Sequence, residues 1–132
     1  MASDEQTVND CLELYRSGRE DDAFRSLVNG GSQLADSLIN ACEECHGDED
    51  LQAFILTVIG EYRAPSKLCY LRHLLRRREE VIWKASLDGL VKAGTREALD
   101  DIEFVLDSVK EPGKRRWIEE AVIGMKKSLG PE

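Results

Sequence analysis

The chain has 132 residues, of which 42% are hydrophobic and 33% charged, which suits one ordered domain with a core of its own. Its net charge of −8 argues against general nucleic-acid binding, because a phosphate backbone needs a positive surface. The acidic start, Met1 to Glu5, has no signal-peptide features, and no apolar run approaches the roughly 18 residues that span a bilayer. We therefore expect a cytoplasmic monomer with four reduced cysteines that binds neither nucleic acid nor membrane.

The negative charge is concentrated in the first half of the chain. Residues 1–62 hold 14 acidic and 3 basic side chains, whereas residues 63–132 hold 12 acidic and 15 basic ones. The balance is therefore −11 in the first half and +3 in the second. Such an acidic half attracts a basic partner. It also keeps a protein soluble, and the sequence alone leaves both interpretations open.

Apolar residues recur at helical spacing along the chain and predict eight helices of about 10–15 residues with short connections. The first helix begins at Ser3, which forms a capping box with Gln6, and Thr95 caps the seventh. No strand pattern accompanies the helices. In chain order, breaks fall at Gly18, Gly30-Gly31, Gly47-Asp48, Ala64-Pro65, Gly94-Thr95 and Glu111-Pro112-Gly113.

The helices also repeat. A shift of 31 residues places Leu68 on Leu99 and the join Arg63-Ala64-Pro65 on Gly94-Thr95-Arg96, and a shift of 36 places Ile82 on Ile118. A helix pair of this length does not bury its apolar faces alone, so repeated pairs stack into a curved array. The alternative is a non-repeating helical bundle whose apolar spacings coincide.

The segment from Ile55 to Leu106 resembles HEAT-like repeats of the short bacterial type, the group that includes the bilin-lyase-like repeats. The chain departs from the pattern at Glu80 and Arg96. The resemblance covers residues 32–129 and implies an all-α, right-handed α-α superhelix of about four antiparallel helix pairs, in a single domain, 1–132, with residues 3–30 as a divergent N-terminal hairpin. Six residues occupy the positions of the repeat pattern: Gly60, Pro65, Leu68, Leu71, Val81 and Ala85.

The resemblance implies a binding surface rather than a reaction centre, because function lies in sites grafted on a fold. A small acidic HEAT-like chain resembles bacterial immunity proteins, which bind and neutralise a cognate toxin, and an acidic surface would suit a basic nuclease toxin. A scaffold or adaptor for a cellular enzyme is an alternative. We expect no enzyme, since neither His46 nor His73 lies in a nucleophile motif, and we expect no cofactor.

The sequence Cys42-Glu-Glu-Cys45-His46 has the letters of a c-type haem attachment site. Cys69 and His73 lie four residues apart and could join Cys42 and Cys45 as zinc ligands. A metal- or tetrapyrrole-handling protein is therefore a further alternative. We interpret Cys42 as a core thiol on the apolar face of the third helix, and we predict no metal site.

The candidate protein-binding residues lie in the second half of the chain. The basic run that includes Arg76 and Arg77 precedes Glu79-Glu80, so these side chains either pair within the chain or bind acidic groups of a partner. Trp83 is predicted to be an exposed anchor, and Trp117 to lie in the core. The predicted binding set is Arg76, Arg77, Trp83, Leu87 and Glu120.

Overall fold

The computed structural model describes residues 3–62 and 65–130, so the predicted join at Arg63-Ala64 lies outside the described residues. The described residues form eight α-helices and one short 3-10 helix, with no strand, which confirms the all-α prediction. None of the helices in this part of the chain combines the length and the apolar composition needed to cross a bilayer. The elements are α1 (Asp4–Arg16), α2 (Glu20–Gly30), η1 (Ser32–Leu34), α3 (Ala35–Glu44), α4 (Glu49–Glu61), α5 (Pro65–Leu74), α6 (Glu80–Ala93), α7 (Arg96–Leu106) and α8 (Pro112–Leu129).

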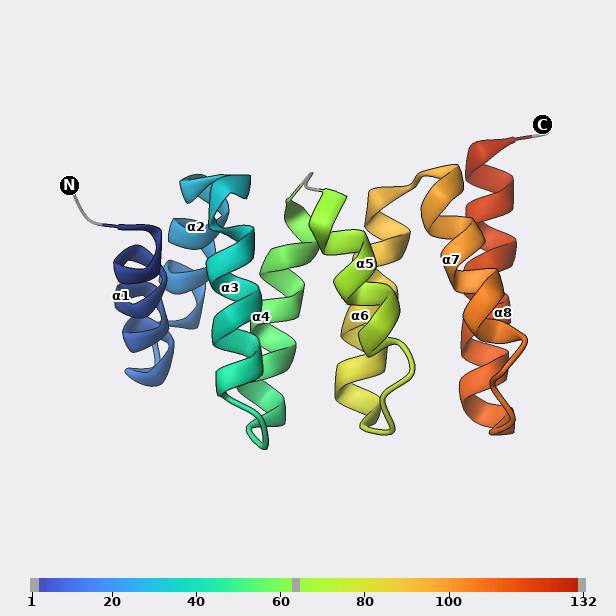
Figure 1. Cartoon of the computed structure of the whole chain (residues 1–132), viewed down its shortest axis with the longest axis horizontal. Helices are drawn as coiled ribbons and strands as arrows, with labels where there is room; N and C mark the ends of the chain where they lie inside the picture. Colours follow the sequence, from blue (N-terminus) through green and yellow to red (C-terminus); the bar gives the residue numbers. More distant parts are fainter. Residues whose placement is uncertain (1–2, 63–64, 131–132) are drawn as a thin grey trace.

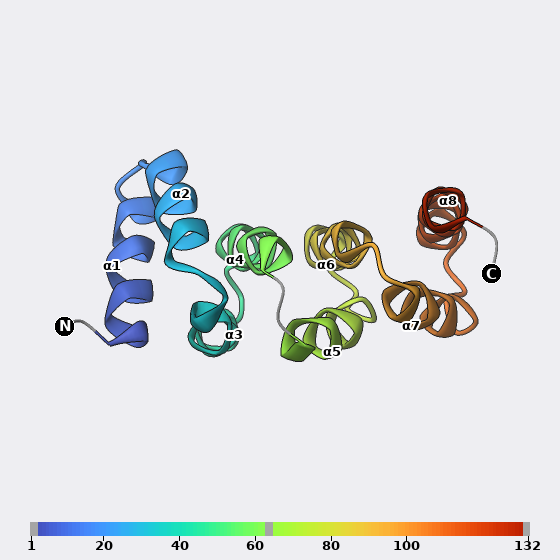
Figure 2. The ribbon, with the colours of Figure 1, turned by 90° about the horizontal axis from the view of Figure 1, so that it is seen from above.

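The helices follow one another along the molecule as four successive pairs (Figure 1). Seen from above, α4, α6 and α8 form one row and α3, α5 and α7 form a second row beside it (Figure 2). The packing agrees, because α4 contacts α6, α6 contacts α8, α3 contacts α5 and α5 contacts α7. The α1–α2 hairpin lies across the direction of the other helices, at the N-terminal end of the two rows (Figure 2).

Side-chain caps define where several helices begin. Ser3 Oγ accepts a hydrogen bond from the backbone N–H of Gln6 at 3.1 Å, and Thr95 Oγ1 accepts one from Ala98 at 3.1 Å, as the sequence predicts. The Gln6 amide donates to Asp10 at 2.8 Å, one turn further along α1. Gly94 ends α6 in the left-handed conformation, with φ of 63°, which glycine adopts without strain.

Within the row of α4, α6 and α8, the closest approach of two backbones is where α4 crosses α6 (Figure 2). A Cβ atom on Gly60 would lie 3.1 Å from the Cα of Gly89, and a Cβ atom on Gly89 would lie 2.7 Å from Cδ1 of the buried Leu71. Two glycines therefore let the backbones of α4 and α6 approach with no side chain between them. A larger residue at either glycine would push α4 and α6 apart, and the side chains between the helices are already closely packed.

Polar contacts tie successive helix pairs together around this core. The Tyr62 hydroxyl donates to the Leu27 carbonyl at 2.6 Å, which fastens the end of α4 to α2. Burial raises the pKa of Tyr62, so the hydroxyl keeps the proton that it donates. Further along the array, Arg72 pairs with Asp101 at 3.0 Å and so links α5 to α7.

Replacing Gly89 with alanine should destabilise the fold. The added methyl group meets Leu71 and Gly60, so we expect Gly89→Ala to lower the free energy of unfolding by about 1–3 kcal/mol. Gly124→Ala is the matched control, because no atom lies within 4 Å of the added Cβ on the exposed face of α8. Alanine favours a helix over glycine, so the control should gain roughly 0.5–1 kcal/mol. Urea unfolding followed by circular dichroism measures both, and equal gains would contradict the close crossing.

Candidate functional site

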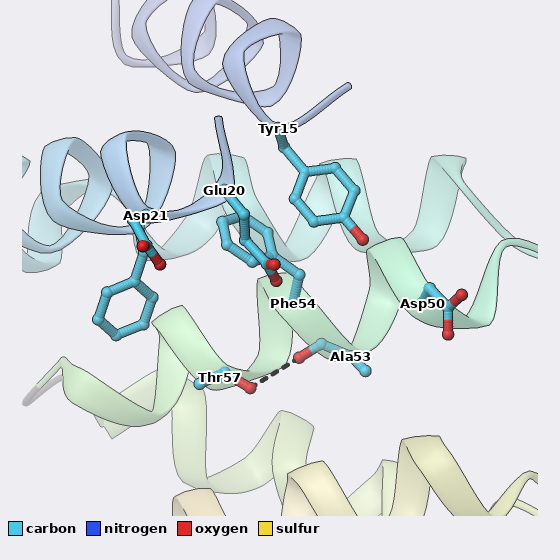
Figure 3. A pocket seen from close by; sticks show the side chains of 8 residues that line it. Tyr15, Glu20, Asp21, Asp50, Ala53, Phe54 and Thr57 are labelled. Atoms are coloured by element: carbon cyan, nitrogen blue, oxygen red, sulfur yellow. Dashed lines mark hydrogen bonds between the residues drawn. The ribbon is translucent and has the colours of Figure 1, made fainter. Parts of the chain in front are cut away.

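A hollow of about 480 Å³ lies between the α1–α2 hairpin and α4. Figure 3 shows side chains from the hairpin and from α4 facing one another across it. Three of its eight lining residues carry carboxylates, and we therefore call it the acidic hollow. Three others are aromatic. The lining residues are Tyr15, Glu20, Asp21, Phe24, Asp50, Ala53, Phe54 and Thr57.

Helical spacing brings the lining residues to a common face. On α4, Asp50, Ala53, Phe54 and Thr57 stand at i, i+3, i+4 and i+7, which are neighbouring positions on one side of a helix. The Thr57 hydroxyl donates to the Ala53 carbonyl at 2.9 Å, as the dashed line in Figure 3 marks. The α4 wall is therefore a regular helical surface that does not depend on a loop.

The hairpin supplies the opposite wall. Tyr15 lies in the last turn of α1, and Glu20 and Asp21 lie in the first turn of α2. Phe24 stands four residues after Glu20 and therefore on the same side of α2. The tight connection between α1 and α2 thus places an aromatic ring and two carboxylates next to one another.

Three aromatic rings form an apolar floor. The ring centroids of Tyr15 and Phe54 are 4.5 Å apart with planes tilted by 35°, and those of Phe24 and Phe54 are 6.5 Å apart in an edge arrangement. Phe54 is buried, whereas Tyr15 and Phe24 are half-buried and present ring surface to the hollow. Offset and edge contacts of this kind hold the rings in place.

The carboxylates at the rim give the hollow a negative potential. Glu20, Asp21 and Asp50 are all exposed, and none of them takes part in an ion pair recorded for the described residues. Partial burial and the neighbouring carboxylates of Glu20, Asp50 and Asp48 raise the pKa of Tyr15. The Tyr15 hydroxyl thus lies in the field of acidic groups from both walls.

Two of the three arginines in residues 1–62 pair with carboxylates that do not line the acidic hollow. Arg16 pairs with Glu13 at 3.1 Å within α1, and Arg19 pairs with Asp22 at 2.8 Å at the start of α2. These two cations are held within a turn of their own partners and make no ion pair with the rim carboxylates.

Two further hollows share the acidic character. One of about 340 Å³ lies between α1 and α3 and includes Glu5, Glu43 and Glu44. The other, about 680 Å³ and widely open, lies along the residues that lead into α4, from His46 to Asp50. The residues that line the three hollows all belong to the first 57 of the chain. Part of the excess negative charge of the first half therefore lies on concave surfaces.

The combination of ring faces and carboxylates is suited to an organic cation. A ring face attracts a guanidinium or ammonium group through its quadrupole, and a carboxylate adds a charge-assisted hydrogen bond. The acidic hollow therefore has the chemistry of a binding site for a basic side chain. Its lining includes no histidine, and the Thr57 hydroxyl is hydrogen-bonded to the Ala53 carbonyl.

The cysteine and histidine residues do not come together as a ligand set. Among the residues that the structure describes, no three His, Cys, Asp or Glu side chains are placed to hold a metal ion, so the arrangement of Cys42, Cys45, Cys69 and His73 as four ligands is not formed. Cys42 is buried, whereas Cys69 is exposed. The Cys42 carbonyl accepts from Gln52 Nε2 at 3.0 Å and from the Cys45 thiol at 3.4 Å. The interpretation of Cys42 as a core thiol is confirmed.

The predicted exposure of the two tryptophans is wrong. Trp83 is only 5% exposed and Leu87 only 1%, whereas Trp117 is 47% exposed. The reason is position in the array. In the described part of the chain, α6 packs against α4, α5, α7 and α8 and so buries a wide face, whereas α8, at the end of its row (Figure 2), packs mainly against α6 and α7. Trp117 meets Trp83 edge-on, with 6.4 Å between ring centroids.

The remaining predicted binding residues are engaged within the chain. Arg77 pairs with Glu79 and Glu120 with Arg116, the latter at 3.6 Å, so pairing of the basic run within the chain is confirmed at Arg77. Arg76 is exposed and lies over the Phe104 ring, 5.4 Å from its centroid. The acidic hollow contains none of the predicted binding residues. Its signal in the sequence is the i, i+4 spacing of Glu20 with Phe24 and of Asp50 with Phe54.

No family model, no curated protein and no solved structure matches this chain.

The buried Cys42 thiol predicts a specific loss of stability at alkaline pH. Burial raises its pKa from the ordinary value of 9.0 to about 11. Below pH 9 the thiol is protonated in the folded and unfolded chain alike. Between pH 9 and 11 the unfolded chain releases the proton and the folded chain keeps it, so stability falls as pH rises.

Cys42→Ala removes this titration and isolates it from that of other groups. At pH 8 the variant should be less stable than the wild type, because the missing thiol leaves a small cavity. The difference in the free energy of unfolding between the two proteins should narrow as pH rises from 9 towards 11, because only the wild type loses the stability linked to the thiol proton. Urea unfolding at a series of pH values measures the difference. A difference that stays constant across this range would show that the thiol is not shielded in the fold.

Proposed function

We propose that this chain is a non-catalytic protein-binding module that engages a basic protein partner through its acidic N-terminal half. In this proposal the helix pairs form a right-handed superhelix of HEAT-like repeats, and the protein acts as a monomer in the cytoplasm. The acidic hollow carries the proposal, because it combines concave shape, exposed ring faces and carboxylates without an ion-pair partner recorded in the described chain.

The uneven charge supports a basic partner. A surface with a balance of −11 attracts a positively charged protein over several ångströms and speeds its association, and salt weakens the attraction. The second half, at +3, adds no such attraction. The partner is therefore expected to approach the N-terminal end of the array.

A toxin fits this proposal best. The resemblance to immunity proteins suggests a bacterial pair in which this chain neutralises its cognate toxin. A toxin that acts on nucleic acid needs a positive surface for its substrate. An acidic protein that covers this surface pairs with the basic residues that would contact the nucleic acid, and so prevents the substrate from binding. Neutralisation then requires no reaction on the part of this chain.

Removing the charge of the acidic hollow should abolish partner capture. The variant Glu20→Gln/Asp21→Asn/Asp50→Asn and the wild type are each used as bait in lysate of the cells that encode the protein. We expect the wild type to retain a basic protein in low salt, identified by mass spectrometry, and the variant to retain much less of it.

The matched control is Asp88→Asn/Glu97→Gln/Asp100→Asn, which removes three exposed carboxylates from α6 and α7 and changes the net charge by the same amount. It should capture the partner as well as the wild type does. Equal losses in both variants would show that net charge alone governs the interaction. A partner with an acidic surface would contradict the proposal outright.

A further inference from the structure

We propose that the acidic hollow holds one arginine side chain of the basic partner, with the guanidinium between the ring faces and the carboxylates of the two walls. This inference rests on the proposed function and names the group that anchors the partner. It follows from three properties of the hollow: ring faces that no cation of the described residues covers, carboxylates on two opposing elements, and small side chains along the α4 wall.

No cation of the described residues lies over the ring faces of the hollow. In the described part of the chain, cations lie over aromatic rings at the other end of the array. Lys84 lies over both Trp83 and Trp117, and Lys114 also lies over Trp83. Arg76 lies over Phe104. The fold therefore covers aromatic faces with cations in its second half. Tyr15 and Phe24, half-buried in the first half, are left open to a cation from outside.

The two walls supply oxygen atoms from different directions. Glu20 stands at the start of α2 and Asp50 at the start of α4, and the hollow separates them (Figure 3). A guanidinium group carries five N–H donors in one plane, so it can donate to carboxylates on two sides while its face lies on a ring. An ammonium group is a compact point charge and stacks less well, which favours arginine over lysine.

The remaining lining suits the stem of the side chain. Ala53 and Thr57 follow Asp50 along the α4 wall, and their small side chains carry methyl groups. The three methylene groups of an arginine can bury against such apolar atoms while the charged head meets the acidic rim. The hollow therefore fits the whole side chain and not only its charge.

Short peptides provide the test. Three peptides of the same Gly-Ser sequence carry a single central arginine, lysine or citrulline, which is the neutral isostere of arginine, and each is titrated into the full chain at low salt. NMR follows the aromatic protons of Tyr15 and the δ-methylene protons of the central residue. We expect arginine to bind more tightly than lysine, and citrulline to bind at least about fivefold more weakly than arginine.

The ring contact has a signature of its own. Methylene protons that lie over an aromatic face shift upfield, so the arginine δ-protons should shift in the wild type. Tyr15→Leu should lose this shift and bind about 2–5-fold more weakly. Glu20→Gln/Asp50→Asn should bind about 5–10-fold more weakly and keep a residual shift. Glu97→Gln/Asp100→Asn, on α7, is the control for charge and should match the wild type.

The outcomes separate this inference from the proposed function. A citrulline or lysine peptide that binds as tightly as the arginine peptide would overturn the assignment to arginine. So would chemical-shift changes that occur only outside residues 15–24 and 50–57. If Tyr15→Leu still captures the basic partner fully while the three-carboxylate variant does not, the acidic surface binds by charge alone and the arginine anchor is wrong. Equal capture by every variant overturns the proposed function itself.

Discussion

The close crossing of α4 and α6 is the constraint on which the rest of the arrangement depends. Gly60 and Gly89 allow the two backbones to touch, and this contact fixes α4 in a row with α6 and α8. Because α4 is held there, its N-terminal half with Asp50 and Phe54 is presented to the α1–α2 hairpin. The Tyr62 hydroxyl bond to Leu27 then holds the hairpin against α4, so the hollow is a consequence of how the array is packed.

The acidic hollow illustrates how a fold can concentrate like charges at little cost. Glu20 and Asp21 lie in the first turn of α2, and Asp50 lies in the first turn of α4. The helix macrodipole favours negative side chains at these positions, typically by about 0.3–1 kcal/mol each. This stabilisation offsets part of the repulsion among the carboxylates. The same residues can therefore stabilise helix ends and leave their charge available to a partner.

The sequence predicts the helices and much of the core, because periodicity, caps and breaks are local. Thr95 and Ser3 cap helices as predicted, and Cys42 lies in the core. The exposure of Trp83 and Trp117 depends on how many helices surround α6 and α8, which no local pattern encodes. The acidic hollow is lined by residues from three helices. The spacing of Glu20 with Phe24 and of Asp50 with Phe54 is visible in the sequence, but the sequence does not show that the α1–α2 hairpin packs across α4 and brings the two pairs together.

The central claim is that a basic partner occupies the acidic hollow, and hydrogen–deuterium exchange of the full chain with and without its captured partner tests it most directly. Backbone amides in a bound surface exchange more slowly. The account predicts slower exchange at residues 15–24 and 48–57, with little change at residues 80–87 and 112–124. Slower exchange confined to the second pair of segments would place the partner on α6 and α8 and contradict the account.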